Sequence, residues 1–301
     1  MRLLYGWILF SISVFAILAG GVFLALVLGA ACFMGGKEFI DMARKKGINP
    51  SSRIVLGMIV AFFVVAGLPA LPPSVLGWQI PDSFSINHFP LLMTVGIFIS
   101  FFRLLFRDQE RPATIADIAS TIMGFIYVGW LPSHLVLLRN LAPSGMPFTD
   151  NPLQQPGLAY VWATIFIIFS TDVFAYYVGK KIGKTLLYPQ ISPKKTLEGS
   201  IGGFVAAMIF SLVIPYLADH YLFACHPFRF NLWQAPLMGA VVSVAAQLGD
   251  LCESLMKRDA GIKDSGDTIP GHGGFIDRGD SLIIGSAVDY YWVYIVVLGN
   301  I

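Results

Sequence analysis

Long uninterrupted apolar runs constrain this chain more than any other feature. Hydrophobic residues fill 56% of its 301 positions and charged residues only 13%, about half the charged share of an ordinary soluble domain. A helix needs about 20 apolar residues to cross the hydrocarbon core of a bilayer, and the sequence supplies such runs repeatedly. The runs are continuous and do not alternate with period two, so they favour spanning helices over a transmembrane barrel.

Nine spans are predicted from the positions of these runs. The stretch from Trp7 to Gly36 is too long for one helix at ordinary tilt, and Gly20-Gly21 can break it into a hairpin. The predicted spans are residues 3–19, 21–39, 53–72, 90–107, 114–138, 157–179, 199–217, 233–257 and 281–300. We therefore expect an all-α, polytopic helix bundle that forms a single membrane domain over residues 1–301.

Basic residues are distributed unevenly among the predicted loops. Eighteen of the 20 Lys and Arg residues lie at the N-terminus or in the even-numbered loops, whereas the odd-numbered loops hold only Arg139 and Arg229. Cytoplasmic loops carry the excess of Lys and Arg, so we place the N-terminus and the even loops in the cytoplasm. The net charge of +2 gives no sign of a nucleic-acid partner, and the three cysteines lack metal-ligand or disulfide spacing.

The predicted loop over residues 257–281 mixes basic, acidic, glycine and histidine residues between two apolar spans. Its glycines, Gly273 and Gly274 among them, allow close approach of the backbone to a ligand. Its candidate phosphate-binding side chains are Lys257, Arg258, Lys263, His272 and Arg278. Asp277 and Asp280, with Asp250 nearby, suit a hard cation such as Mg²⁺. A loop that only sets topology needs no such array, so we predict a ligand-binding loop.

A polar stripe runs along the span that precedes this loop. Its members recur at helical spacings of three and four and share one face: Ser243, Gln247, Asp250, Ser254 and Lys257. A carboxylate inside a span is costly and normally faces a partner or a wet cavity. We expect Asp250 to join Asp277 around a shared ion; the alternative is a structural ion pair within the bundle.

A second polar cluster brackets the predicted loop over residues 180–198. Asp172 lies near the end of the sixth span, and Ser192, Lys194 and Lys195 precede the seventh. Lysines beside the positive N-terminal end of a helix would form an anion site. The alternative is that the two lysines serve topology alone. Lys37, Glu38 and Asp41, by contrast, indicate an ordinary amphipathic extension of the second span.

These motifs together resemble the phosphatidate cytidylyltransferase family, which makes CDP-diacylglycerol. The signature matches in register at Ser254, Lys257-Arg258, Lys263-Asp264, Ile269-Pro270, His272-Gly273-Gly274-Phe275, Asp277-Arg278 and Asp280. The Ser-Pro-Lys-Lys-Thr-x-Glu-Gly segment and the Gln247-x-Gly249-Asp250 segment are also similar. The resemblance is strong over residues 157–281 and rests on hydropathy alone over residues 1–156. One departure is Gly279, where the family usually has an apolar residue or Thr.

The resemblance implies attack by the phosphate of phosphatidic acid on the α-phosphorus of CTP, which releases pyrophosphate. It implies a metal pair, Mg²⁺ with a second cation, held by Asp250, Asp277 and Asp280. Lys194, Lys195, His272 and Arg278 would contact phosphates, Asp172 and Asp264 would orient that shell, and residues 157–301 would be the catalytic spans. It also suggests a homodimer in the bacterial inner membrane, with the active site facing the cytoplasm.

Three competing interpretations stay open. Intramembrane Asp250 and Asp172 with glycine-rich spans are also typical of an ion-coupled transporter, although a transporter would carry such features in corresponding positions of two halves. A related enzyme that acts on a different lipid phosphate, such as an isoprenoid ether lipid, would show the same motifs. A silent membrane scaffold would not need the aspartates.

Overall fold

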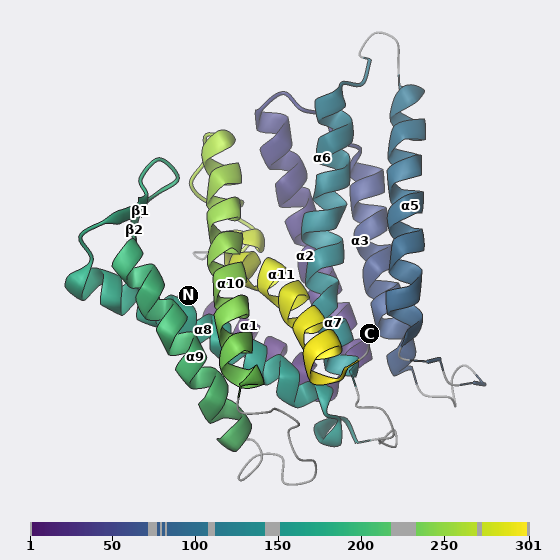
Figure 1. Ribbon diagram of the computed structural model, residues 1–301. Helices are drawn as coiled ribbons and strands as arrows, with labels where there is room; N and C mark the ends of the chain where they lie inside the picture. The colour runs from purple at the N-terminus through teal and green to yellow at the C-terminus, as the bar shows by residue number, and fades with distance from the viewer. Residues whose placement is uncertain are drawn as a thin grey trace. The chain divides into compact units, whose positions relative to one another are not determined.

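The computed structural model describes residues 2–71, 77–78, 80–81, 83–107, 112–141, 151–217, 233–269 and 273–299 (Figure 1). These residues are almost entirely helical, as predicted, and the strands among them form one two-stranded antiparallel sheet. The chain divides into two compact units: Met1–Leu137 with Met256–Gly279, and Leu138–Leu255 with Asp280–Ile301. The predicted division after residue 156 and the single membrane domain stay predictions.

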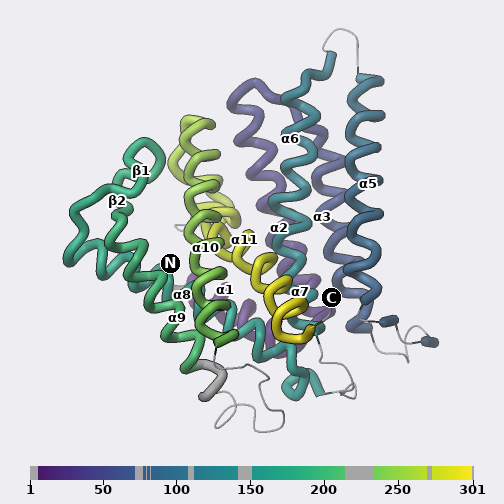
Figure 2. The backbone as a smooth tube through the Cα atoms, viewed as in Figure 1, coloured from purple at the N-terminus to yellow at the C-terminus, as the bar shows by residue number. Residues whose placement is uncertain are grey.

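The first unit is a helical bundle. Its helices are α1 (Arg2–Ala19), α2 (Gly21–Lys45), α3 (Ser52–Gly67) with the short η1 (Leu68–Ala70), α5 (Ser83–Leu105), α6 (Ile115–Phe125), the π-helix η2 (Ile126–Trp130) and the start of α7 (Leu131–Asn140). Gly20 has φ 95° and separates α1 from α2, which confirms the predicted break. Helices α2, α3, α5 and α6 run alongside one another in Figures 1 and 2.

The core of this bundle is aromatic and aliphatic, and α3 provides its centre. Phe62 of α3 is fully buried and its ring lies 5.4 Å from that of Phe89 and 6.3 Å from that of Phe125. Polar contacts fix one end of the bundle, because Asp117 accepts hydrogen bonds from Arg107 Nη1 at 3.1 Å and from the Asn49 backbone N–H at 2.5 Å. Asp117 and Thr114 also form a capping box that begins α6.

The second unit is built from α8 (Gly157–Ile182), α9 (Leu197–Leu217) and most of α10 (Gln234–Asp259) and α11 (Ile276–Tyr291), followed by the π-helix η5 (Trp292–Val297). The short η3 (Pro152–Gln154) precedes α8. Its core cluster is formed by small and medium side chains of α8, α9 and α10: Ala163, Ile167, Ile168, Ala207, Met238, Val242 and Ala246. Strands β1 (Leu186–Tyr188) and β2 (Ser192–Thr196) form a hairpin that joins α8 to α9 (Figures 1 and 2).

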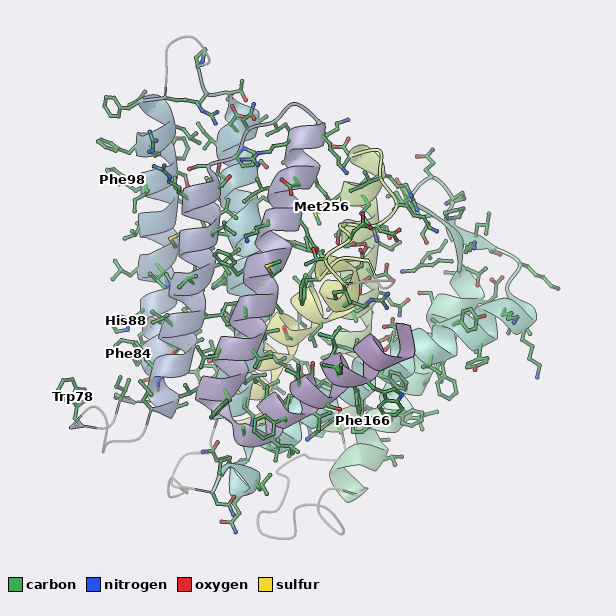
Figure 3. All side chains as sticks on the ribbon, turned by 180° about the vertical axis from the view of Figure 1, so that it is seen from behind. Trp78, Phe84, His88, Phe98, Phe166 and Met256 are labelled. Carbon is green, nitrogen blue, oxygen red and sulfur yellow. The ribbon has the colours of Figure 1, made fainter. Side chains whose placement is uncertain are left out.

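The apolar helices match a membrane setting. Seven helices of the described residues are long and apolar enough to cross a bilayer, and Gly6–Ala19 and Leu197–Val213 are shorter apolar helices. Together they account for the nine predicted positions. Helix α5 leaves a row of large apolar side chains exposed, including Phe98, which Figure 3 shows pointing outward from the bundle. Lipid would cover such a face, and the protein is an integral membrane protein.

Several predicted boundaries need correction. Helix α5 begins at Ser83, whereas its predicted span begins at 90. Helix α10 continues to Asp259 and α11 begins at Ile276, so Asp277, Arg278 and Asp280 lie on a helix and not in the loop predicted over 257–281. An acidic first turn favours this start, because the N-terminal end of a helix is positive. Helix α2 also continues six residues past the predicted end at 39. The loop over 180–198 contains the β-hairpin, which the sequence analysis did not predict.

Candidate active site

Asp277 lies in the first turn of α11 and is surrounded by donors. Its Oδ1 accepts from Lys257 Nζ at 2.7 Å, and its Oδ2 accepts from the backbone N–H groups of Ser265 and Gly274 at 2.8 and 2.9 Å. The Ser265 hydroxyl lies 3.0 Å from the same oxygen. The side chains of Lys257 and Asp277 are only 13% and 11% exposed, so this is a nearly buried, fully hydrogen-bonded ion pair.

The other predicted residues of this segment are less enclosed. Gly273 has φ 82°, a conformation that side chains disfavour, and its carbonyl accepts from the Ile269 backbone N–H at 2.9 Å. Arg258 is exposed and donates to the Ile262 carbonyl at 3.2 Å. The side chains of Lys263, Asp264 and Arg278 are exposed, as a shell that receives a ligand from solvent requires. His272 lies outside the described residues.

Glu38 is a member of this cluster that the sequence analysis missed. It was interpreted as part of an amphipathic extension, yet it is 5% exposed. Its carboxylate accepts hydrogen bonds from Ser265 and Thr268 and from the backbone N–H groups of Phe275 and Ile276. That interpretation was wrong for Glu38. The available signal was an acid on the same helical face as Gly35, three residues earlier, just after a long apolar run.

A separate cluster surrounds Asp250 in the second unit. Lys195 of β2 donates to Asp250 Oδ2, and Ser254 Oγ lies 3.4 Å from Asp250 Oδ1. Asp172 of α8 and Asp280 of α11 interact electrostatically with Asp250, and Ser281 hydrogen-bonds Asp172. A Cβ at Gly249 would lie 2.7 Å from the Asp280 carbonyl oxygen, so glycine lets α10 and α11 approach closely here.

The predicted stripe on α10 lies on one face and is hydrogen-bonded along its length. Thr171 of α8 donates to Ser243 Oγ at 3.0 Å, and Gln247 Nε2 donates to Ser243 Oγ at 3.2 Å. Ser200 of α9 donates to Gln247 Oε1. The stripe therefore joins α10 to α8 and α9, and it leads along α10 to Asp250.

The two lysines of β2 differ in their surroundings. Lys195 contacts Asp250, whereas Lys194 is exposed. The pairing of β2 with β1 is irregular over this stretch, because Leu186 and Tyr188 pair with Thr196 and Ser192, so simple alternation does not set the directions of the two lysines. Ser192 lies at the start of β2, paired with Tyr188, and is partly buried. Glu198 accepts from the backbone N–H groups of Lys184 and Thr185, at 3.1 Å each, and closes the base of the hairpin.

The Asp250 cluster has the donor chemistry of a cation site. Three carboxylates, those of Asp172, Asp250 and Asp280, interact with one another and with Lys195. Such an excess of carboxylate oxygens suits a hard divalent cation. In the described parts of the chain, no group of three or more His, Cys, Asp or Glu side chains is arranged as a ready set of metal ligands. A predicted shared ion between Asp250 and Asp277 stays a prediction.

Comparison with known proteins gives a consistent result. The sequence profile described as "Cytidylyltransferase family" matches residues 1–296. The chain is 35% identical to a phosphatidate cytidylyltransferase of Synechocystis sp., over 95% of this chain and 94% of that protein. It is 32% identical to chloroplastic phosphatidate cytidylyltransferase 4 of Arabidopsis thaliana, over 92% and 68%. It is 29% identical to the phosphatidate cytidylyltransferase of Bacillus subtilis, over 94% and 93%.

Proposed function

This chain belongs to the cytidylyltransferase family, and from that premise we propose that it is a phosphatidate cytidylyltransferase of phospholipid biosynthesis. It transfers CMP from CTP to phosphatidic acid and releases pyrophosphate. The observation that carries this proposal is the likeness to named phosphatidate cytidylyltransferases over nearly the whole chain. The same likeness favours this enzyme over an ion-coupled transporter or a silent scaffold.

The reaction does not need a general base from the protein. An oxygen of the lipid phosphate attacks the α-phosphorus of CTP, the bond to the β-phosphate breaks, and pyrophosphate leaves with the electron pair. A phosphomonoester has a second pKa near 6, so it is already mostly dianionic at neutral pH. The protein must instead align two anionic phosphates and offset their repulsion. Two polar clusters with lysines at their centres are consistent with that task.

We assign the positive charge to named side chains. Lys195 would bind a phosphate oxygen from its position beside Asp250, and Lys257 would do so beside Asp277. The exposed Arg258, Lys263 and Arg278, with Lys194 and His272, would gather the triphosphate from solvent. Gly273 and Gly274, which lack side chains, would let the backbone of the segment come close to the phosphates. Ser192 and Asp264 would orient neighbouring contacts.

A divalent cation is part of this proposal. Asp250 and Asp280, with Asp172 beside them, have the oxygen donors and the negative charge to hold Mg²⁺. Asp277 is the further predicted ligand, and an ion there would share its oxygens with Lys257 and Ser265. When bound, Mg²⁺ would stabilise the charge that develops on the phosphate oxygens.

The membrane setting decides how the two substrates would arrive. CTP is water-soluble and phosphatidic acid is held in the bilayer, so the site must open to both. The excess of Lys and Arg in the even loops supports a site on the cytoplasmic side. A bacterial inner membrane is the location that we expect, and the homodimer stays a prediction.

Transfer of label tests this function directly. Purified protein in detergent is incubated with Mg²⁺, phosphatidic acid and CTP labelled at either the α- or the γ-phosphorus. We expect the α-label to enter lipid and the γ-label to appear only in pyrophosphate. A parallel reaction with an isoprenoid ether lipid phosphate distinguishes the lipid classes. Absence of α-label from lipid in every reaction would contradict the proposal.

A further inference from the structure

Glu38 is a buried acid in the half of the chain where the family motifs are absent. It lies on α2 and is 5% exposed, whereas the side chain of Asp41, less than one turn later, is 67% exposed. Burying a carboxylate is costly unless hydrogen bonds compensate the lost water. The compensation comes from the segment that joins α10 to α11.

Four donors of that segment converge on the Glu38 carboxylate. Thr268 Oγ1 donates at 2.7 Å and Ser265 Oγ at 2.9 Å. The backbone N–H groups of Phe275 and Ile276 donate at 2.9 and 3.2 Å. Ile276 is the first residue of α11, and the first N–H groups of a helix have no partner within the helix. Glu38 therefore caps α11 from a distant part of the sequence.

Two glycines of the segment lie very close to the side chain of Glu38. A Cβ at Gly266 would lie 3.0 Å from Glu38 Cγ, and a Cβ at Gly274 would lie 2.7 Å from Glu38 Cδ. On α2, a Cβ at Gly35 would lie 3.3 Å from Ile276 Cγ1. A Cβ at Gly274 would therefore force its neighbours to move, and one at Gly266 or Gly35 would be a tight contact. This close fit is independent of the hydrogen bonds and indicates that α2 and the segment are matched.

Glu38 is linked to Asp277 through Ser265. The Ser265 hydroxyl lies 2.9 Å from Glu38 Oε2 and 3.0 Å from Asp277 Oδ2. Its single hydrogen can serve one carboxylate at a time. The two backbone N–H groups held by Glu38 also belong to the residues immediately before Asp277. The carboxylate of Glu38 thereby fixes both the backbone and one side-chain neighbour of Asp277.

We propose that Glu38 is a positioning residue of the active site, one that sets the orientation of Asp277 and, through it, of Lys257. This inference rests on the proposed function. It assigns to α2 a part in catalysis beyond anchoring the chain in the membrane. Glu38 does not touch substrate in this role; it acts through the segment that it caps.

Glu38→Gln tests the proposal with little change in shape. The amide presents an NH₂ group where donors converge, so at least one of the four hydrogen bonds is lost. We expect kcat to fall on the order of 10- to 100-fold, the cost typical of a lost supporting contact, with KM for CTP changed little. Amide hydrogen exchange at residues 273–277 should become faster. Asp41→Asn is the matched control, because it removes the same charge from an exposed site on the same helix and should keep kcat within about twofold.

A double-mutant cycle separates positioning from a loss of folding. Thr268→Val removes one donor and leaves three, so it should give a smaller loss of kcat without unfolding. The double variant Glu38→Gln with Ser265→Ala should lose less kcat than the product of the two single losses, because both changes act on Asp277.

Two outcomes would overturn the proposal: wild-type kcat and wild-type amide exchange in Glu38→Gln, or an equal loss of kcat in Asp41→Asn. If the wild type makes no CDP-lipid, the proposed function fails. Amide hydrogen exchange tests the capping of α11 by Glu38 separately, and an unchanged exchange rate in Glu38→Gln would refute it.

Discussion

Asp277 and Asp250 lie on the two helices that flank the signature segment, yet their surroundings differ in charge. Around Asp277, a lysine, two backbone N–H groups and a hydroxyl provide donors for both oxygens. Around Asp250, two further carboxylates gather and Lys195 offsets them in part. The first arrangement is suited to hold the segment in one shape. The second is suited to receive positive charge, as a metal-binding site is.

The largest effect is expected for Asp250→Asn. The change removes one of three clustered carboxylates and the partner of Lys195. We expect kcat to fall about 1,000-fold, the upper range for a lost electrostatic contact at a reaction centre. The measurement is α-label transferred from CTP to lipid, with unfolding followed by thermal melting.

Ser254→Ala is the matched control for this change. Ser254 lies one turn from Asp250 on α10, and its long 3.4 Å hydrogen bond to Asp250 contributes little to holding that carboxylate. Activity within about threefold of wild type is expected, as for a change away from the reacting groups. Retention of a substantial part of the wild-type rate by Asp250→Asn would instead favour a structural ion pair.

The lysines of the two clusters should separate stability from activity. Lys257→Met leaves Asp277 buried without its cation, which costs roughly 1–3 kcal/mol after allowance for partial exposure. We expect a lower melting temperature together with a loss of activity. Lys195→Met should reduce activity with little change in melting, because this pair is 33% and 24% exposed. An equal fall in melting temperature for Lys257→Met and Lys195→Met would show that the two clusters do not differ in their contribution to stability.

Much of the fold could be predicted from the apolar runs. The break at Gly20 and the nine apolar helices follow from run length and glycine placement, which depend on local sequence. Helix starts at polar boundaries were predicted less well. The start of α11 at Ile276 depends on Glu38, more than 200 residues earlier, whose carboxylate accepts from its first N–H group. The local sequence does not contain this contact, although the acidic residue Asp277 in the first turn is a local signal for the same start.

The site shows the same limit. The signature placed Lys257 and Asp277 in one cluster, and the stripe on α10 was predicted from its spacing alone. The difference between Lys194 and Lys195 could not be predicted, because the β-hairpin that brings Lys195 to Asp250 was not foreseen. Glu38 was missed because charges near a span end usually serve topology, and only its burial distinguishes it from Asp41.

The proposed magnesium requirement should respond to a change at Asp280. Asp280→Asn removes one negative charge from the cluster and keeps the shape of the side chain. We expect the Mg²⁺ concentration for half-maximal activity to rise about 10-fold, as one weakened contact of about 1.4 kcal/mol implies. Asp267→Asn is the control, because Asp267 is exposed in the segment between α10 and α11. An unchanged Mg²⁺ requirement in Asp280→Asn would remove Asp280 from the set of metal ligands.

The smallest effect is expected for Lys194→Met. Its side chain is exposed, whereas that of Lys195 pairs with Asp250, so Lys194 can attract CTP from solvent without touching the reacting phosphates. Its removal should raise KM for CTP within about threefold and leave kcat unchanged, and added salt should diminish the difference, because exposed charges are screened. Lys195→Met should lower kcat instead. If both substitutions lowered kcat alike, the strand would present both lysines to the substrate, and the separation of roles along β2 would be wrong.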